Sequence, residues 1–249
     1  MAVLPHEGTY TIMYGPWPIP VGAGYRNGYI ARPDKEGRFP TIILSPDING
    51  ITAHEKYVAR RLARLGLAVV AVDFYPTRPG PGDDPLAAYA AVDDRAGTWT
   101  LDEAYQFLSS DDIDWAHTSK VGVMGLDVGG RFAAIVASRR PWVGGLVLVS
   151  TPIVGDEDRE NQMVQILGRL AVPVLGLYGA DDDLVPSETV DLAQETTPAG
   201  QFLLYAGAGH GFMDEVGPDF HPGAAEDAIL RIAEFFQAVL PPPQLEELG

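Results

Sequence analysis

The sequence predicts an α/β fold in which a mostly parallel central sheet of about eight strands is flanked by helices. Short runs of β-branched and other apolar residues alternate with longer amphipathic segments, the pattern of strand–helix units that build a parallel sheet. No polar linker interrupts the 249 residues before the end of the chain. We therefore expect a single domain over residues 1–249, with residues 241–249 as a flexible tail that begins with three consecutive prolines.

The expected elements follow this alternation along the chain. Two leading strands, expected to pair as a hairpin, are predicted at 9–13 and 27–31. Buried strands are then predicted at 41–44, 67–72, 121–124, 145–149, 172–177 and 201–205. Helices are predicted at 54–65, 85–92, 100–109, 129–140, 156–170 and 224–239. The interval between the strands at 145–149 and 172–177 is too short for a cap domain, so any lid must be a loop.

Composition and charge exclude several classes of protein and site. With 17 Lys or Arg residues and 34 Asp or Glu residues, the formal net charge is −17, so we expect no nucleic-acid partner. Hydrophobic residues make up 46% of the chain, which is typical of a globular protein with a sizeable core. The absence of cysteine excludes a disulfide, a thiolate zinc site and a cysteine nucleophile. The histidines lack metal-site spacing, and no phosphate-cradling or dinucleotide-binding glycine motif occurs, so we expect no metal and no cofactor.

The start of the chain carries no targeting signal that we recognise. Pro5, His6 and Glu7 stand where a secretory signal would need a basic run followed by an apolar one. The longest apolar stretch, near residues 65–75, is about half the length of a membrane-spanning helix. We expect a cytoplasmic protein without a membrane partner, either a monomer or a homodimer.

A tight turn between a strand and a helix is expected within residues 121–131. Its centre reads Gly125-Leu126-Asp127-Val128-Gly129-Gly130, which has the form of a nucleophile elbow. In such a turn the central residue is held in a strained conformation, so that its side chain stands clear of the sheet. Flanking glycines suit this turn because neighbouring backbone passes too close for Cβ atoms. Taken alone, the window also fits an ordinary glycine-rich turn whose exposed aspartate caps the helix.

Two further windows place polar residues just beyond the ends of predicted strands. Asp182 follows the strand at 172–177, and His210 follows the strand at 201–205. Open α/β sheets gather their sites at the carboxyl ends of their strands. The order nucleophile, acid, histidine along the chain is that of the α/β-hydrolase fold. The three windows together favour Asp127, Asp182 and His210 as a catalytic triad.

On these windows the sequence resembles the dienelactone hydrolase family of α/β-hydrolases over nearly the whole chain. The family's elbow reads Gly-x-Cys-x-Gly-Gly, and Asp127 stands where the family has its cysteine nucleophile. Residues 179–186 and 207–212 are similar to the family's acid and histidine windows, with Asp182 at the acid position. Asp47 lies in a segment that resembles the one where the family carries a glutamate. The resemblance implies a hydrolase with a small-molecule substrate.

An aspartate at the elbow favours chemistry different from that of an ordinary esterase. A carboxylate is ionised at neutral pH and needs no base to activate it. Its attack on an ester carbonyl would give a mixed anhydride, which is more reactive than the substrate. Its attack on a saturated carbon gives an alkyl ester that water can cleave, as in epoxide hydrolases and haloalkane dehalogenases, which share the fold and this aspartate. We therefore expect Asp127 to open an epoxide or a similar electrophile, and His210, oriented by Asp182, to activate the water.

Other residues are assigned supporting roles on the same reasoning. The backbone N–H groups of Val128 and Ile48 are expected to hold the oxyanion on the Asp127 carbonyl. Epoxide opening also needs an acid near the leaving oxygen, and the candidates are Tyr14, Tyr75 and Arg78. Aromatic and thioether side chains expected to line an apolar pocket are Trp17, Trp142, Phe212 and Met213. Charged residues expected on the solvated face of the helix at 54–65 are Glu55, Arg60, Arg61 and Arg64.

Two other functional hypotheses remain open at this stage. If Asp47 lies beside Asp127, the two carboxylates repel, one takes up a proton, and the pair can act as the acid and base of a non-covalent cyclase, lyase or hydratase. Asp47 can equally be a turn residue. Alternatively, the fold has lost catalysis and binds a ligand, or its original nucleophile has been replaced. Since Asp182 and His210 are both present, a long-abandoned active site is the weaker hypothesis.

Overall fold

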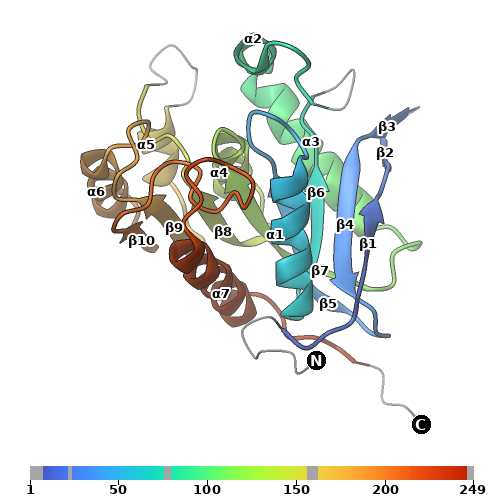
Figure 1. The fold of residues 1–249 in the computed structure, drawn as a ribbon. Helices are drawn as coiled ribbons and strands as arrows, with labels where there is room; N and C mark the ends of the chain where they lie inside the picture. Colours follow the sequence, from blue (N-terminus) through green and yellow to red (C-terminus); the bar gives the residue numbers. More distant parts are fainter. Residues whose placement is uncertain (1–7, 22–23, 76–79, 156–161, 246–249) are drawn as a thin grey trace.

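The computed structural model describes residues 8–21, 24–75, 80–155 and 162–245. Its core is an eight-stranded sheet in the order β1-β4-β6-β5-β7-β8-β9-β10 (Figure 1). The strands of this sheet are β1 (Ile12–Pro16), β4 (Gly28–Pro33), β5 (Phe39–Ser45), β6 (Ala68–Val72), β7 (Ala116–Leu126), β8 (Val143–Val149), β9 (Val174–Gly179) and β10 (Gly200–Tyr205). The pairs from β6 to β10 are parallel, whereas β1 and β4 run antiparallel to their neighbours. The predicted α/β class is confirmed.

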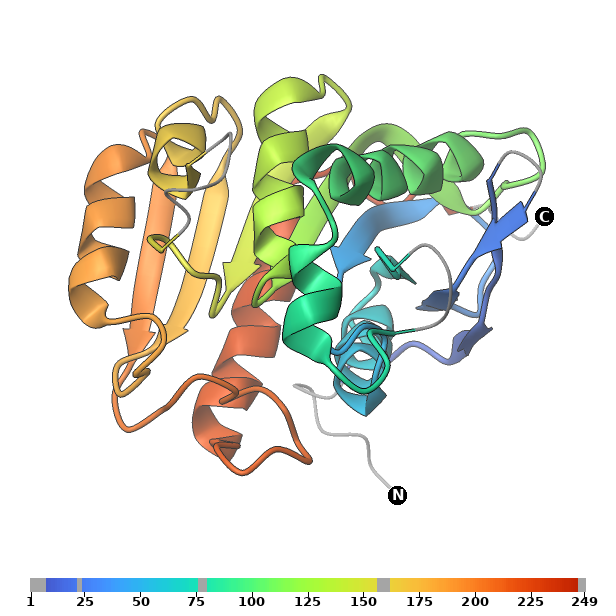
Figure 2. The same cartoon turned by 90° about the horizontal axis from the view of Figure 1, so that it is seen from above.

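Helices cover both faces of the sheet. They are α1 (Ala53–Arg64), α2 (Pro85–Ala90), α3 (Asp94–Leu108), α4 (Gly129–Arg139), α5 (Met163–Leu167), α6 (Ser187–Thr196) and α7 (Pro222–Val239). Helices α1 and α7 lie against one face, and α3 and α4 lie against the other (Figure 2). The two cores follow from the alternation of strand side chains, with Ile43 facing α4 and Ile42 and Leu44 facing α1. None of the helices in the described part of the chain has the length and apolar character needed to cross a bilayer.

Several elements differ from their predicted bounds. Helix α3 begins at Asp94 rather than at residue 100, because the Asp93 side chain caps it by accepting from the Ala96 N–H at 2.7 Å. Its Gly97 weakens the helix signal, yet a Cβ there would meet the Phe132 ring at 2.3 Å, so tight packing against α4 requires glycine. The helix predicted at 156–170 is represented only by α5, and residues 156–161 lie outside the described chain.

Three elements were not predicted at all. The short strands β2 (Ile19–Val21) and β3 (Gly24–Arg26) form an antiparallel pair between the two leading strands, and α6 follows β9. The expected pairing of the leading strands is nevertheless present, since β1 runs antiparallel to β4. The start of the expected flexible tail is tied down, because Gln244 exchanges two backbone hydrogen bonds of 2.8 Å with Arg38.

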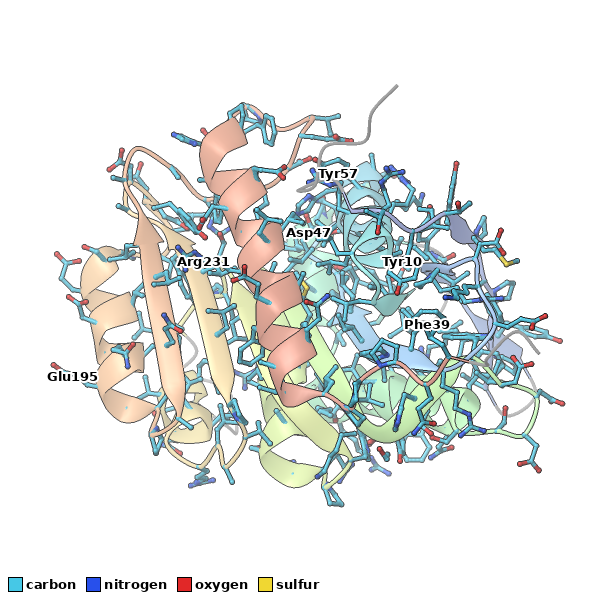
Figure 3. The ribbon with its side chains drawn as sticks, turned by 90° about the horizontal axis from the view of Figure 1, so that it is seen from below. Tyr10, Phe39, Asp47, Tyr57, Glu195 and Arg231 are labelled. Atoms are coloured by element: carbon cyan, nitrogen blue, oxygen red, sulfur yellow. The ribbon has the colours of Figure 1, made fainter. Side chains whose placement is uncertain are left out.

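Aromatic packing closes the amino-terminal end of the sheet. The Tyr10 ring meets the ring of Phe39, the first residue of β5, edge-on with centroids 5.8 Å apart (Figure 3). The opposite end, where the parallel strands finish, is where the loops carrying the predicted site residues gather.

Candidate active site

Asp127 occupies the tip of the turn between β7 and α4. Its φ of 46° lies in the left-handed region that non-glycine residues rarely adopt, as expected for an elbow. The turn is held on both sides, because the Asp127 N–H donates to the Val149 carbonyl at 2.9 Å and the Gly130 N–H donates to the Asp127 carbonyl at 3.1 Å. The side chain therefore projects from a fixed backbone position at the carboxyl end of the sheet.

The glycines around Asp127 are there because backbone passes at close range. A Cβ on Gly125 would lie 2.2 Å from the Gly130 Cα, and a Cβ on Gly129 would lie 2.1 Å from the Pro46 carbonyl oxygen. A Cβ on Gly130 would collide with the side chain of Thr151 at 1.9 Å. The plainer interpretation, an ordinary capping turn, is not supported, since the Asp127 side chain lines a cavity and the cap residue of α4 is Val128.

The structure brings His210 and Asp182 to the same place as Asp127. His210 Nε2 lies 3.4 Å from Asp127 Oδ1, and His210 Nδ1 lies 2.9 Å from Asp182 Oδ2. Asp182 is itself fixed, because its Oδ1 accepts from the N–H groups of Leu184 at 2.8 Å and Val185 at 2.9 Å. The imidazole is thus held between two carboxylates, one buried and one facing the cavity.

The charges in this triad decide the protonation of His210. Burial alone lowers the pKa of the imidazole, but the carboxylates of Asp127 and Asp182 outweigh it and raise the pKa to about 10. Burial raises the pKa of Asp182, but its hydrogen bonds with His210, Val185 and Leu184 outweigh that effect and lower it overall. At neutral pH the triad accordingly holds an imidazolium, which can give a proton before it can accept one.

Asp47 also faces this cavity, on the loop after β5. Burial and the nearby charge of Glu55 raise the pKa of Asp47 to about 7, with a further contribution from Asp127. The Asn49 N–H donates to Asp47 Oδ1 at 2.6 Å, so Asp47 is a turn residue as well as a cavity residue. The carboxyl group is poised between its two protonation states at neutral pH.

Glu55 lies beneath this loop rather than on a solvated face. It is fully buried in α1, where its Oε2 accepts from the Thr52 N–H at 2.8 Å and the Thr52 hydroxyl at 2.6 Å. Its burial raises the pKa of the carboxyl group. The prediction of an exposed Glu55 was therefore wrong, because this glutamate closes a capping box with Thr52. Arg61 is also paired rather than free on the surface, since it binds Glu226 of α7 at 2.8 Å.

The two backbone positions expected to form an oxyanion hole both line the cavity. Val128 follows Asp127, and Ile48 lies on the loop after β5. The hydroxyl of Tyr75 donates to the Ile48 carbonyl at 2.6 Å, which fixes the peptide plane of that loop. Burial raises the pKa of Tyr75 well above its usual value. Tyr75 therefore positions the loop and is not among the described residues that line the cavity.

The cavity has a volume of about 500 Å³ and an apolar wall. Its described lining residues are Asp47, Ile48, Asn49, His54, Leu86, Leu126, Asp127, Val128, Val149, Ser150, Pro152, Leu184, His210, Gly211, Phe212, Met213 and Asp214. Phe212 and Met213, which were expected to line an apolar pocket, are among these residues. Leu86 on α2 and Leu184 on the loop after β9 are strongly exposed, so they form the rim.

Other predicted pocket residues lie elsewhere. Tyr14 is exposed on β1, where the guanidinium of Arg60 lies 5.7 Å from its ring centroid. Trp17 packs edge-on against Trp115 in the core, and Trp142 stacks on Tyr105 at 4.3 Å. The expectations for Tyr14 and Trp17 were wrong because the leading strands pair at the edge of the sheet, away from the elbow. The expectation for Trp142 was wrong because this residue precedes β8 and lies at the end of the sheet opposite the elbow. Arg78 lies outside the described residues.

The sequence alone did not single out three other cavity residues. His54 and Asp214 flank the polar side of the cavity, and Ser150 follows β8 with a left-handed φ of 48°. A second strained residue directly after a neighbouring parallel strand marks the same end of the sheet, but β-strand patterning does not reveal it. His54 carried no signal in the sequence beyond its place at the start of a helix.

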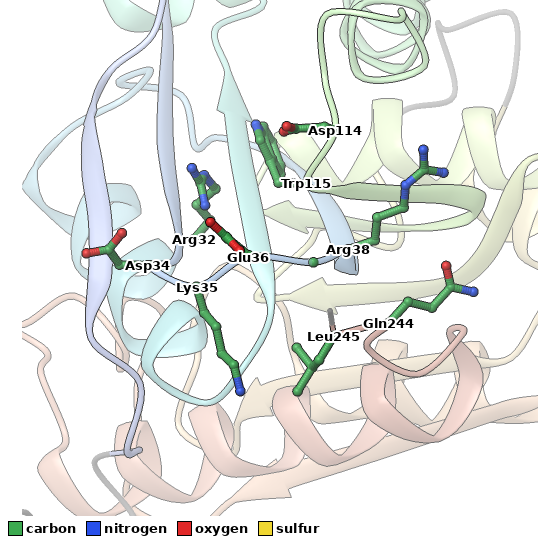
Figure 4. Close-up of a pocket in the computed structure, with 10 residues that line it drawn as sticks. Arg32, Asp34, Lys35, Glu36, Arg38, Asp114, Trp115, Gln244 and Leu245 are labelled. Atoms are coloured by element: carbon green, nitrogen blue, oxygen red, sulfur yellow. The ribbon is translucent and has the colours of Figure 1, made fainter. Parts of the chain in front are cut away.

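A larger hollow of about 730 Å³ lies at the opposite end of the sheet (Figure 4). It contains three basic side chains, Arg32, Lys35 and Arg38, and three acidic ones, Asp34, Glu36 and Asp114. It adjoins the start of β5 and β7, whereas sites in open α/β sheets form where the strands finish. Size alone would favour this hollow, but the smaller cavity contains the strained aspartate and the paired histidine.

Comparison with known proteins decides the family. The model of the dienelactone hydrolase family matches residues 27–240. The chain belongs to the dienelactone hydrolase family. A "Putative carboxymethylenebutenolidase" of Methylorubrum extorquens is 31% identical over 234 residues, covering 88% of this chain and 79% of the relative. A carboxymethylenebutenolidase of Rhodococcus opacus is 28% identical, covering 85% of this chain and 86% of the relative.

Solved structures of the dienelactone hydrolase family share the fold. A crystal structure described as a "Putative Dienelactone Hydrolase" from Klebsiella pneumoniae superposes with a TM-score of 0.82 and 25% identity, covering 91% of this chain and 98% of that one. A dienelactone-hydrolase-like promiscuous phosphotriesterase from metagenomic libraries gives a TM-score of 0.75 at 22% identity, covering 92% and 99% of the two chains. The second likeness concerns the fold alone. The chain is thus a member of a hydrolase family, with an aspartate at the tip of its elbow.

Proposed function

We propose that this dienelactone hydrolase family member hydrolyses small electrophiles, epoxides in particular, through an alkyl ester on Asp127. One observation carries the proposal: His210 lies between the elbow carboxylate and a second, buried carboxylate, at 3.4 Å and 2.9 Å. An acyl mechanism on Asp127 would pass through a mixed anhydride and gain little. The relatives are named for lactone substrates, and the aspartate separates this chain from that chemistry.

In the first step, an oxygen of the Asp127 carboxylate attacks an epoxide carbon, and the carbon–oxygen bond of the ring breaks. The leaving oxygen takes the proton held on His210, whose pKa of about 10 keeps it protonated at neutral pH. The products of this step are a hydroxyalkyl ester on Asp127 and a neutral imidazole. The imidazolium thereby fills the role of the acid that Tyr14 and Tyr75 are not placed to fill.

In the second step, the same histidine acts as a base. Ester formation removes the negative charge of Asp127, so one of the two carboxylates that raise the His210 pKa is lost. The neutral imidazole then takes a proton from a water molecule that attacks the Asp127 carbonyl carbon. The N–H groups of Val128 and Ile48 would stabilise the resulting oxyanion. Collapse of this intermediate releases the diol and regenerates the Asp127 carboxylate beside an imidazolium.

The test is to trap the ester in His210→Gln. A glutamine amide still offers an N–H to the opening oxygen but cannot accept a proton from water. Incubation with 1,2-epoxybutane should add the mass of one epoxide to the protein, and peptide mapping should place it on Asp127. His117→Gln is the matched control, since His117 lies at the start of β7, and it should turn over without an adduct. A His210→Gln protein that still turns over the epoxide without forming an adduct would overturn the covalent mechanism.

A second candidate function rests on Asp47. Its pKa of about 7 and its interaction with Asp127 suit a non-covalent acid–base pair, in which one carboxyl group gives a proton and the other removes one. This would be the chemistry of a cyclase, lyase or hydratase. It predicts no adduct in any variant, and a loss of turnover in Asp47→Asn at least as large as in His210→Gln.

A further inference from the structure

The cavity has a polar side that the proposed mechanism does not use. Asp47, His54 and Asp214 line it from three different segments: the loop after β5, the first turn of α1 and the loop before α7. The charges of Asp214, Asp47 and Glu215 all act on the His54 ring. The opposite wall is formed by apolar residues.

His54 is the unusual member of this group. It is only 7% exposed, and its ring nitrogen Nδ1 is buried without a hydrogen-bond partner in the described part of the chain. Nδ1 is closed to solvent, so a ligand in the cavity would contact this histidine through the other atoms of its ring. Burial lowers the pKa of His54, so the ring is neutral and one of its nitrogens can accept a hydrogen bond.

The two carboxylates beside it still have free acceptor capacity. Asp214 uses Oδ1 to accept from the Val216 N–H at 3.2 Å. Asp47 accepts from the Asn49 N–H through Oδ1 and only weakly, at 3.4 Å, from the Asn49 amide through Oδ2. A neutral imidazole with two carboxylates is a set of acceptors with negative charge. Such a set matches a group that carries several N–H donors and a positive charge.

We propose that Asp47, His54 and Asp214 form a subsite for a protonated amine, so that the preferred substrates are small electrophiles carrying an ammonium group. The inference rests on the proposed hydrolase function and adds its substrate class. The apolar wall from Phe212 and Met213 would then hold the hydrocarbon between the ammonium group and the reacting carbon. The formal charge of −17 also steers cations toward the protein and keeps carboxylate substrates away.

The first experiment measures binding without any chemistry. Butylammonium, butyrate and butanol are titrated into the protein at pH 7.5, with binding followed by calorimetry and by the histidine ring signals in NMR spectra. Butylammonium should bind at least tenfold more tightly than either other probe and should shift the His54 signals. Asp214→Asn and His54→Phe should each weaken butylammonium binding by fivefold or more. Asp191→Asn on α6 removes the same charge from an exposed position and should leave the binding unchanged.

The second experiment separates this inference from the proposed function. Steady-state rates are compared for 4-amino-1,2-epoxybutane and for 1,2-epoxypentane. Asp214→Asn should raise KM for the amine substrate by fivefold or more while changing kcat and the rates on the neutral epoxide little. Equal binding of butyrate and butylammonium, or no effect of either cavity variant, would overturn the subsite. If the ester is trapped but the amine substrate is not preferred, the mechanism is retained and the subsite is rejected. If butylammonium binds selectively but no ester forms, the subsite is retained and the covalent mechanism is rejected.

Discussion

The protonation of His210 depends on Asp127, and replacing Asp127 by asparagine tests that dependence. The two carboxylates raise the His210 pKa from 6.5 to about 10 even though burial opposes them. Asp127 contributes a share at least comparable to that of Asp182, and one close opposite charge typically shifts a pKa by about 1 to 3. The Asp127→Asn variant should therefore show a His210 pKa of about 8 or below, which is a loss of ~2.7 kcal/mol in proton affinity.

The assay is an NMR titration of the histidine ring signals between pH 5 and pH 11. The chain has 5 histidines, and the signals of His210 are identified by their absence in His210→Gln. Asp183→Asn is the matched control, because its carboxylate is exposed next to Asp182, and it should leave the His210 pKa near 10. A His210 pKa that is already near 6.5 in the unmodified protein, or one that Asp127→Asn does not change, would refute the reasoning.

Three further outcomes follow from packing and charge. Gly129→Ala places a Cβ 2.1 Å from the Pro46 oxygen and should lower the free energy of unfolding in urea by about 2 to 4 kcal/mol. Gly15→Ala, at a position with open space around it, should change the free energy of unfolding by less than about 0.5 kcal/mol. Equal effects of the two variants would contradict the elbow geometry. Asp94→Ala removes the carboxylate that lies 2.7 Å from the buried Arg131 guanidinium and should cost about 3 to 5 kcal/mol. Asp227→Ala, at the exposed pair with Arg231, should cost under about 1 kcal/mol. In the folded protein His210 keeps its proton up to about pH 10, whereas an unfolded histidine releases its proton near pH 6.5. The imidazolium therefore stabilises the fold fully below pH 6.5, and this stabilisation is lost as the pH rises through 10. The stability gap between the unmodified protein and His210→Gln should therefore shrink from pH 6 to pH 10 in chemical denaturation, and a constant gap would contradict the pKa.

The parts of the site that sequence reasoning found are those with short-range signatures. The elbow is a local pattern of three glycines within six residues. Gly125 meets the backbone of Gly130, Gly129 meets the backbone at the end of β5, and Gly130 meets the Thr151 side chain. Asp182 and His210 were found because each follows a strand directly, and parallel strands finish at the same edge. Phe212 was found for the same reason, since it lies two residues after His210.

The errors concern features set by packing at a distance. Tyr14 and Trp17 lie near the start of the chain, and only the pairing of β1 at the far edge of the sheet separates them from the cavity. Glu55 has the periodicity of a surface residue but is buried because it caps its own helix and supports the loop of Asp47. The role proposed for His54 depends on its place in the cavity wall beside Asp47 and Asp214, which only the folded chain reveals.

The most direct test of an ester on Asp127 is a single turnover in oxygen-18 water, with the protein in excess over the epoxide. The account predicts that the diol from the first turnover contains unlabelled oxygen and that one heavy oxygen enters the peptide containing Asp127. Heavy oxygen found in the first diol, with the Asp127 peptide unchanged, would contradict it.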